Sequence, residues 1–178
     1  MIFRATRRSF NVVILIAVIA LGGCASLGPA ADSSGVAALT NAVDHAEGTV
    51  RQHFHAFWFP NEAGYTDMNK ATIGSGGKEF TEGFLVLADK SLIFLVWDRL
   101  IKEYSVLIRI PYDRLSSVRL TRFGRSRRVT VRELDTLRPN TFEIVSGLLV
   151  DQKASAQVAA FINAKIQSNN THDSRGKP

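Results

Sequence analysis

The sequence predicts an α+β protein in which a curled antiparallel β-sheet is preceded by one α-helix and capped by another. Three patterns support this fold class. Apolar residues recur at intervals of three and four in one segment near the start, which is typical of one face of a helix. At least five segments with strand character follow, some apolar almost throughout and others with alternating apolar and polar residues, and the turn residues between them are typical of consecutive antiparallel strands. The last segment is amphipathic, and a curled sheet needs such a helix to cover its open end.

The first 23 residues are typical of an export signal and not of a folded domain. They hold Arg4, Arg7 and Arg8 and no acidic residue, so half of the formal net charge of +6 belongs to them. An apolar run from Val12 to Leu21 follows the arginines. About ten apolar residues are too few for a membrane-spanning helix, which needs roughly 20. With one such run and a single cysteine in 178 residues, the composition disfavours a disulfide scaffold, a polytopic membrane protein and a multidomain enzyme.

The segment Leu21-Gly22-Gly23-Cys24 matches the lipobox of bacterial lipoproteins: a branched apolar residue, two small residues and cysteine. The resemblance implies that residues 1–23 are a signal peptide, and that Cys24 receives acyl chains on its thiol and on its new amino group. The membrane is then a partner through this anchor. Ala25 stands where aspartate favours retention in the inner membrane, so the resemblance favours the outer membrane, facing the periplasm. The alternatives are an ordinary secretory signal and an uncleaved anchor.

The first elements of the mature chain are predicted to be a tether and a helix. Residues 24–35 are rich in Ala, Ser and Gly and predict a flexible tether. A helical stripe then predicts a helix over 36–56, within an N-terminal helical segment 36–59 that ends before Pro60; its members are Val36, Leu39, Val43, Ala46, Val50, Phe54 and Phe57. Gly48 opposes this helix by about 1 kcal/mol relative to Ala. The aromatic residues 57–59 are predicted to pack on the sheet, with a partner-facing or membrane-facing patch as the alternative.

The remaining elements follow from alternation and turn residues. Residues 60–77 have no sustained period and predict a loop that includes at most one short strand. Strands are predicted at 80–87, 92–97, 105–110, 118–121, 128–132 and 141–146. Turns at 88–91 and 123–126 are predicted to join the first pair of strands and the fourth strand to the fifth. A helix is predicted over 154–167, and a disordered tail over 169–178.

Two segments carry a resemblance to a known superfold. They are Glu82-Gly83-Phe84-Leu85-Val86-Leu87-Ala88-Asp89-Lys90-Ser91-Leu92-Ile93-Phe94-Leu95 and Ile108-Arg109-Ile110-Pro111-Tyr112-Asp113-Arg114-Leu115-Ser116-Ser117-Val118. Their order resembles the pleckstrin-homology-like (PH-like) superfold, especially its bacterial PH and GRAM-like branch. The resemblance implies a domain at 78–168 that forms a partly open barrel capped by the C-terminal helix. Because the connection 88–91 holds only one base beside one acid, no phosphoinositide site is carried over.

A cluster of arginines is the most unusual local feature of the predicted sheet. The candidate binding surface consists of Arg119, Arg122, Arg125, Arg127, Arg128 and Arg132. Alternation places Arg119, Arg128 and Arg132 on the non-core face, and Arg125 and Arg127 at a hairpin tip. Arginine binds phosphate and carboxylate bidentately, so the partner is an anionic head group or an acidic envelope protein. The alternative is a solvated edge that prevents pairing with other chains, and export argues against nucleic acid as the partner.

The sequence predicts no catalytic, metal or cofactor site. On a helix His45, His53 and His55 would not converge on one face. The glycine-rich run 74–78 lacks both ends of the phosphate-loop pattern, and an acylated Cys24 is no nucleophile. The sequence therefore predicts a non-catalytic binding or scaffolding module in the cell envelope. The alternatives are an accessory subunit of an envelope assembly or hydrolase complex, and an enzyme with its active site in residues 60–79.

Overall fold

The computed structural model of the protein describes residues 27–29, 35–60, 80–124, 126–136, 139–147 and 149–173. In chain order the elements are α2 (Val36–Asn41), the 3-10 helix η4 (His45–Glu47), β1 (Val50–Phe59), β2 (Thr81–Ala88), β3 (Ser91–Asp98), β4 (Glu103–Pro111), the 3-10 helix η6 (Tyr112–Arg114), β5 (Leu115–Phe123), β6 (Ser126–Glu133), β7 (Asn140–Ser146), β8 (Leu149–Val150) and α3 (Gln152–Asp173). The predicted α+β class and the C-terminal helix are confirmed.

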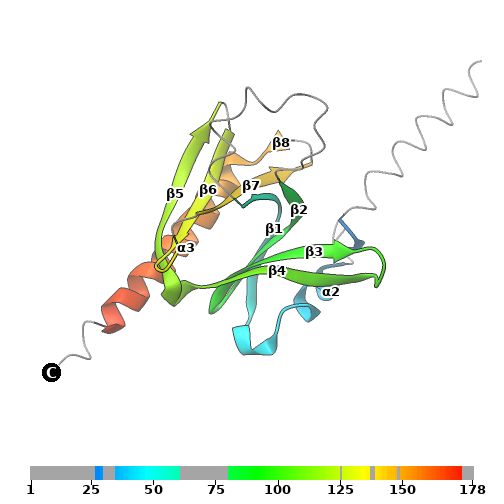
Figure 1. Ribbon diagram of the computed structural model, residues 1–178, viewed down its shortest axis with the longest axis horizontal. Coiled ribbons are helices and arrows are strands. Elements are labelled where there is room, and N and C mark those ends of the chain that lie inside the picture. The colour runs from blue at the N-terminus through cyan, green and yellow to red at the C-terminus, as the bar shows by residue number, and fades with distance from the viewer. Residues whose placement is uncertain are drawn as a thin grey trace, which may run out of the picture.

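The described strands form one antiparallel sheet that curls without closing (Figure 1). Their order is β4-β3-β2-β1-β7-β6-β5, and β8 pairs with β7. The edge strands β4 and β5 are consecutive in the chain, with only the three residues of η6 between them. The curl therefore brings one end of each edge strand together, and α3 packs against β5, β6, β7 and η6 beside this corner.

The concave side of the sheet and one face of α3 enclose the main core. Phe94 and Phe142 are fully buried in it, with ring centroids 5.8 Å apart. From α3 the core receives residues four positions apart, namely Ala154, Val158, Ile162 and Ile166. The side chain of Asp151 accepts a hydrogen bond from the backbone N–H of Ala154 at 2.8 Å, which satisfies one free N–H at the start of α3.

A second core lies on the opposite side of β2 and β3. Phe84, Val86, Ile93 and Leu95 point to this side and are covered by the N-terminal segment that contains Leu39 and Val43. Strands buried on both faces need apolar residues at odd and even positions alike, because no face meets water. This explains the continuous apolar runs in β2 and β3.

The predicted helix over 36–59 is wrong beyond Asn41. The chain instead forms a short α2, then η4, and from Val50 to Phe59 the strand β1. Gly48 separates them with a φ of +81°, a backbone conformation that a continuing helix excludes. β1 is central, because it pairs with β2 on one side and with β7 on the other. The stripe members within β1 do not share a face: Phe54 packs against the main core and Val50 against the second, so their helical spacing did not reflect the actual element.

Other predicted boundaries hold with small shifts. All six predicted strands are present, and both predicted turns join the expected strands. The helix α3 continues to Asp173, so the predicted tail over 169–178 is wrong for its first five residues. Within the predicted tether, Leu27 and Gly28 have a fixed place: the Leu27 carbonyl accepts a hydrogen bond from the Tyr104 hydroxyl at 2.6 Å. The predicted signal peptide, Cys24 and the residues 61–79 lie outside the described residues.

Candidate functional site

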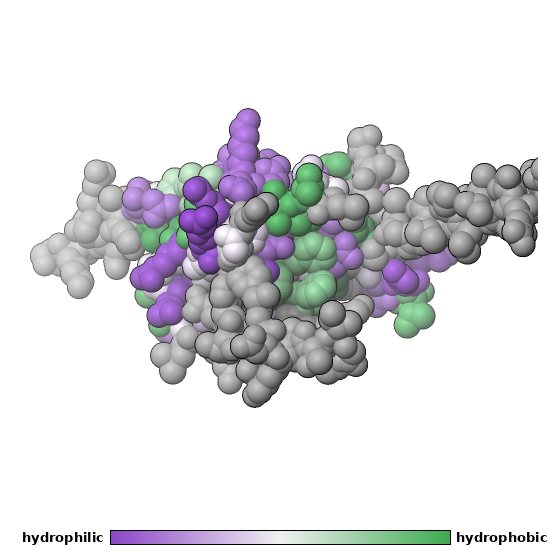
Figure 2. Space-filling model, turned by 90° about the horizontal axis from the view of Figure 1, so that it is seen from above, coloured by the Kyte–Doolittle hydropathy of each residue, from purple (hydrophilic) through white to green (hydrophobic). Residues whose placement is uncertain are grey.

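The β5–β6 hairpin carries the predicted arginine surface. Its register places Arg122 directly opposite Arg127, Arg119 opposite Thr130, and Thr121 opposite Arg128. Gly124 closes the turn with a φ of +56°, a conformation that glycine adopts without strain. Figure 2 shows hydrophilic side chains gathered over β5 and β6. Because Val129 and Val131 are in the core, Arg128 and Arg132 lie on the non-core face, as alternation predicted.

Arg128 is occupied by the fold. Its Nε donates to Oε2 of Glu143 on β7 at 2.5 Å, and the Arg128 side chain is only 11% exposed. The guanidinium also stacks over the Phe59 ring, 4.0 Å from its centroid. Arg128 thus connects β6 to β7 and to β1. The sequence predicted that Arg128 belongs to the binding surface, but its guanidinium is already occupied by these contacts.

The other described arginines of this surface are exposed. They are Arg119, Arg122, Arg127 and Arg132. Within the part of the chain that the structure describes, none of these four forms an ion pair with a carboxylate. Arg122 donates from Nε to the carbonyl oxygen of Gly124 at 3.3 Å, which leaves the rest of its guanidinium available. Arg125 lies outside the described residues.

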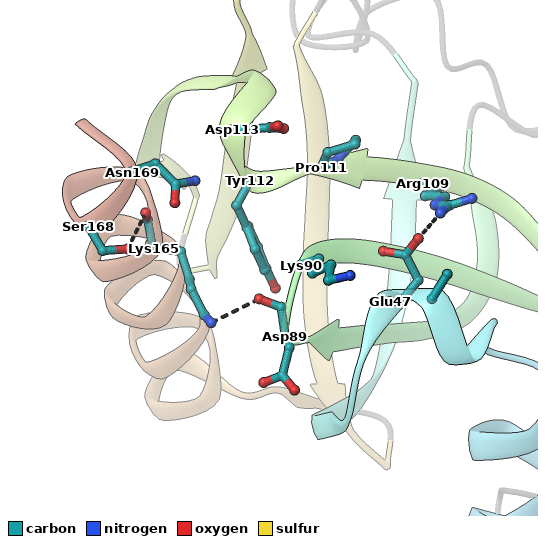
Figure 3. A pocket seen from close by; sticks show the side chains of 11 residues that line it. Glu47, Asp89, Lys90, Arg109, Pro111, Tyr112, Asp113, Lys165, Ser168 and Asn169 are labelled. Carbon is teal, nitrogen blue, oxygen red and sulfur yellow. Dashed lines mark hydrogen bonds and ion pairs between the residues drawn. The ribbon is translucent and has the colours of Figure 1, made fainter. Parts of the chain in front are cut away.

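A polar pocket of about 490 Å³ lies at another place, where the β2–β3 turn meets η4, η6 and α3 (Figure 3). No pattern in the sequence predicted this pocket. It is lined by Ala46, Glu47, Asp89, Lys90, Arg109, Pro111, Tyr112, Asp113, Lys165, Ser168 and Asn169. Backbone hydrogen bonds fix its frame: Lys90 N–H donates to the carbonyl of Glu47, and Tyr112 N–H donates to the carbonyl of Lys90.

Two of the acidic groups of the pocket, Glu47 and Asp89, form ion pairs. Glu47 is buried, pairs with Arg109 and accepts a hydrogen bond from the hydroxyl of Ser91. Asp89 pairs with Arg51 at 2.6 Å, and this hydrogen bond is the main reason that the pKa of Asp89 lies below its usual value. Lys165 Nζ donates to the backbone carbonyl of Asp89 at 2.9 Å. Three acidic side chains (Glu47, Asp89, Asp113) and three basic ones (Lys90, Arg109, Lys165) line the pocket, so its formal net charge of zero does not suit a highly charged ligand.

Tyr112 differs from the paired acidic residues of this pocket because its polar group has no partner among the described residues. Its hydroxyl is buried, and among the described residues it has no hydrogen-bond partner. Burial raises the pKa of Tyr112 above its usual value, and the negative charge of Asp89 adds to this increase. Such an orphaned hydroxyl costs stability unless it meets a polar group.

Among the described residues, His45, His53 and His55 lie on two different elements and do not form a metal centre. His45 lies in η4, whereas His53 and His55 lie on β1, and His55 Nε2 is 3.0 Å from Oε1 of Glu82. In the described ranges no group of three or more histidine, cysteine, aspartate or glutamate side chains is placed to hold a metal ion. Nor does any helix in those ranges have the length and apolar character needed to cross a membrane.

Comparison with known proteins does not identify a family. No protein-family model matches this chain, and no curated protein sequence matches it significantly. The proposals below therefore rest on the residues and their geometry.

Proposed function

We propose that this chain is an exported bacterial lipoprotein whose body is a non-catalytic binding or scaffolding module of the cell envelope. The lipobox ending at Cys24 supports the anchor, and Ala25 supports sorting to the outer membrane, facing the periplasm. The strand order and the helix α3 that covers the curled sheet support kinship with the PH-like superfold. A shared fold does not define a ligand, so the binding surface must be argued from its own residues.

One observation carries the binding proposal: Arg122 and Arg127 face each other across the tip of the β5–β6 hairpin. Like charges directly opposite each other destabilise a strand pair. Arg128, the next residue, is neutralised by Glu143, whereas no carboxylate among the described residues pairs with the two tip arginines. A group with phosphate or carboxylate oxygens would relieve this repulsion, because arginine binds such groups bidentately. The proposed partner is therefore an anionic head group or an acidic envelope protein.

The anchor is tested on the full chain expressed in a diderm bacterium. Mass spectrometry of the N-terminal peptide from the purified membrane protein should give Cys24 at the amino end, carrying diacylglycerol and an amide-linked acyl chain. A Cys24→Ser variant should remain unacylated and keep its first 23 residues. An unmodified Cys24 thiol in the wild-type protein would contradict the proposed anchor.

The arginine tip is tested with the chain Ala25–Pro178, sedimented with phosphatidylglycerol-containing and purely zwitterionic vesicles at low and high salt. Each basic residue near an anionic surface contributes about 1 kcal/mol, so Arg122→Ser/Arg127→Ser should weaken salt-sensitive binding about tenfold or more. The control Arg114→Ser/Lys153→Ser removes the same charge elsewhere and should bind much more tightly than the tip variant.

Equal binding by the tip variant and the control would contradict a head-group site at the tip. Photo-crosslinking from position 127 in intact envelopes then distinguishes an acidic protein partner from an accessory subunit that has no ligand of its own. An arginine-dependent crosslink to an acidic protein supports the second kind of partner. The accessory-subunit alternative instead predicts that neither substitution changes any interaction.

A further inference from the structure

The tip of the β3–β4 hairpin presents two apolar side chains to the solvent. The side chains of Leu100 and Ile101 are exposed, with 94% and 59% of the residue surface accessible. The exposed basic residues Arg99 and Lys102 flank them. This arrangement places an apolar centre between two cations, with Asp98 and Glu103 one position further from the tip, and exposure of the apolar centre to water is unfavourable.

The exposure of this tip follows from a defined turn. Asp98 Oδ1 accepts hydrogen bonds from the backbone N–H groups of Leu100 at 2.8 Å and Ile101 at 3.4 Å. The strands pair up to Asp98 and Glu103, and Lys102 completes the turn with a φ of 55°. The hairpin projects from the body of the sheet, on the right in Figure 1. The backbone therefore holds the two apolar side chains away from both cores.

Leu27 and Gly28 lie against the same hairpin. The Leu27 carbonyl accepts a hydrogen bond from the hydroxyl of Tyr104, and Gly28 lies so close to Trp97 that a Cβ there would collide with the indole ring. Trp97 and Tyr104 are cross-strand neighbours near the tip. Cys24 is three residues before Leu27, so its α-carbon lies within about 11 Å of the Leu27 α-carbon.

We propose that the β3–β4 tip inserts Leu100 and Ile101 into the interface of the membrane leaflet that holds the acyl chains of Cys24. This inference rests on the proposed anchor. The anchor brings the tip to the bilayer, the two apolar side chains enter the boundary between head groups and acyl chains, and Arg99 and Lys102 remain at the level of the lipid phosphates. A second contact beside the anchor would restrict the rotation of the body on the membrane.

This orientation places the polar pocket away from the bilayer. The pocket is built around Asp89 and Lys90, which precede β3, whereas the tip follows the other end of that strand. Eight residues of strand span about 26 Å. In Figure 1 the C-terminal part of α3 also lies on the opposite side of the molecule from this hairpin.

The sole cysteine of the chain makes a site-specific test possible, because an acylated Cys24 cannot react with a thiol probe. Full-length protein with Leu100→Cys is purified from membranes, labelled with an environment-sensitive fluorophore, and reconstituted into vesicles of phosphatidylethanolamine and phosphatidylglycerol. Leu149→Cys is the matched control, because Leu149 is also an exposed leucine but lies in β8. Wild-type protein carried through the same labelling measures the acylation of Cys24.

The label at position 100 should shift its emission to shorter wavelength on reconstitution and should be quenched about twofold or more by nitroxides placed near the lipid head groups. The label at position 149 should keep its aqueous emission. Equal access of both labels to an aqueous quencher would overturn the insertion. Protection of position 100 from both aqueous and lipid quenchers would also overturn it, because the tip would then contact protein, such as a second copy of this chain.

The labelling of wild-type protein separates failure of the anchor from failure of the insertion. If the wild-type protein reacts with the probe and does not float with vesicles, the proposed anchor is wrong and the insertion is rejected with it. If the wild-type protein is unreactive and floats, but position 100 stays in water, only the insertion is wrong.

Discussion

Neighbouring arginines in β6 have different roles. Arg128 is nearly buried, paired with Glu143 and stacked on Phe59, whereas Arg127 is exposed and faces Arg122. The side-chain period of a strand is two, so adjacent residues point to opposite faces and meet different surroundings. The same residue type therefore serves the fold at one position and is available for a partner at the next.

Arg128→Ala should lower the free energy of unfolding by about 3 kcal/mol, because it leaves the nearly buried carboxylate of Glu143 without its cation. Arg127→Ala, the matched control, should change it by at most about 0.5 kcal/mol. Urea denaturation followed by tryptophan fluorescence measures both values. Similar losses for the two variants would contradict the distinction between them.

Tyr104 and Tyr112 differ in whether their hydroxyls form a hydrogen bond. The Tyr104 hydroxyl donates to the Leu27 carbonyl, whereas the buried hydroxyl of Tyr112 has no partner among the described residues. Tyr104→Phe should therefore cost about 1 kcal/mol of stability, and Tyr112→Phe should be neutral or stabilising by a similar amount. Thermal unfolding of both variants tests this; a loss above about 1 kcal/mol for Tyr112→Phe would mean that the hydroxyl has a favourable partner in solution.

The raised pKa of Tyr112 predicts a dependence of stability on alkaline pH. Above pH about 10 the unfolded chain releases the phenolic proton while the folded protein retains it. Since the folded state then binds more protons, stability that is present below this pH is lost as the pH rises further. The wild type should lose more stability than Tyr112→Phe between about pH 10 and pH 11 in denaturation at each pH. Parallel losses would contradict the shift.

At the scale of elements, the close approach of β2 and β3 requires a glycine at position 83. A Cβ on Gly83 would collide with the carbonyl oxygen of Leu95 and crowd the ring of Phe94. Gly124, in contrast, has open space around it and differs from ordinary residues only in its φ of +56°. Glycine is thus required by packing at the first position and by backbone conformation at the second.

Gly83→Ala should reduce the free energy of unfolding by about 3 kcal/mol, because β2 and β3 must separate to admit the methyl group. Gly124→Ala should cost about 1 kcal/mol, the usual penalty of a left-handed residue. Chemical denaturation monitored by circular dichroism gives both values. A smaller loss at Gly83 than at Gly124 would show that the two strands separate easily.

In β1 the tertiary structure overrode the helical spacing of the local sequence, and the segment forms a strand. Phe54, Ala56 and Trp58 point to the main core, whereas His55 and Phe57 point to the other face. Val50, Phe54 and Phe57 also satisfy a helical stripe, so spacing alone did not distinguish the two structures. Two neighbouring strands provide the backbone hydrogen bonds that decide for a strand.

At the scale of the whole molecule, the N-terminal segment completes the fold. Leu39 and Val43 cover the side of β2 and β3 that faces away from the main core. Without them four large apolar side chains of these strands would meet water, at a cost of about 25 cal/mol per Å² of exposed apolar surface. The described residues 35–43 are therefore part of the domain, and under the proposed anchor the same segment would link the domain to the membrane.

Leu39→Ala should destabilise the whole protein by about 3 kcal/mol in one cooperative transition, because it opens a cavity in the second core. The control Ala37→Ser lies at an exposed position of α2 and should change stability by about 0.5 kcal/mol or less. Hydrogen exchange of β2 and β3 amides provides the second measurement. If Leu39→Ala increased exchange only in residues 35–43, the segment would be an independent attachment.

The sequence by itself determined the features that depend on local chemistry. These are the apolar and alternating runs that predict six of the strands, two of the turns between strands, and the amphipathic α3, whereas the export signal and lipobox stay predictions. Each depends on residues close together in the chain, so periodicity and turn residues are enough to predict it. The arginine hairpin was predicted for the same reason, including the face on which Arg128 and Arg132 lie.

Only the tertiary structure decided which residues meet across the chain. It made β1 a strand, paired Arg128 with Glu143, buried Glu47 beside Arg109, and joined Leu27 to Tyr104. These contacts join residues 15 to 77 positions apart, and their selection depends on sheet register and curl. A residue type indicates what a side chain can bind, whereas the fold determines whether a partner already occupies it, because an ion pair or hydrogen bond forms only between groups brought within contact distance.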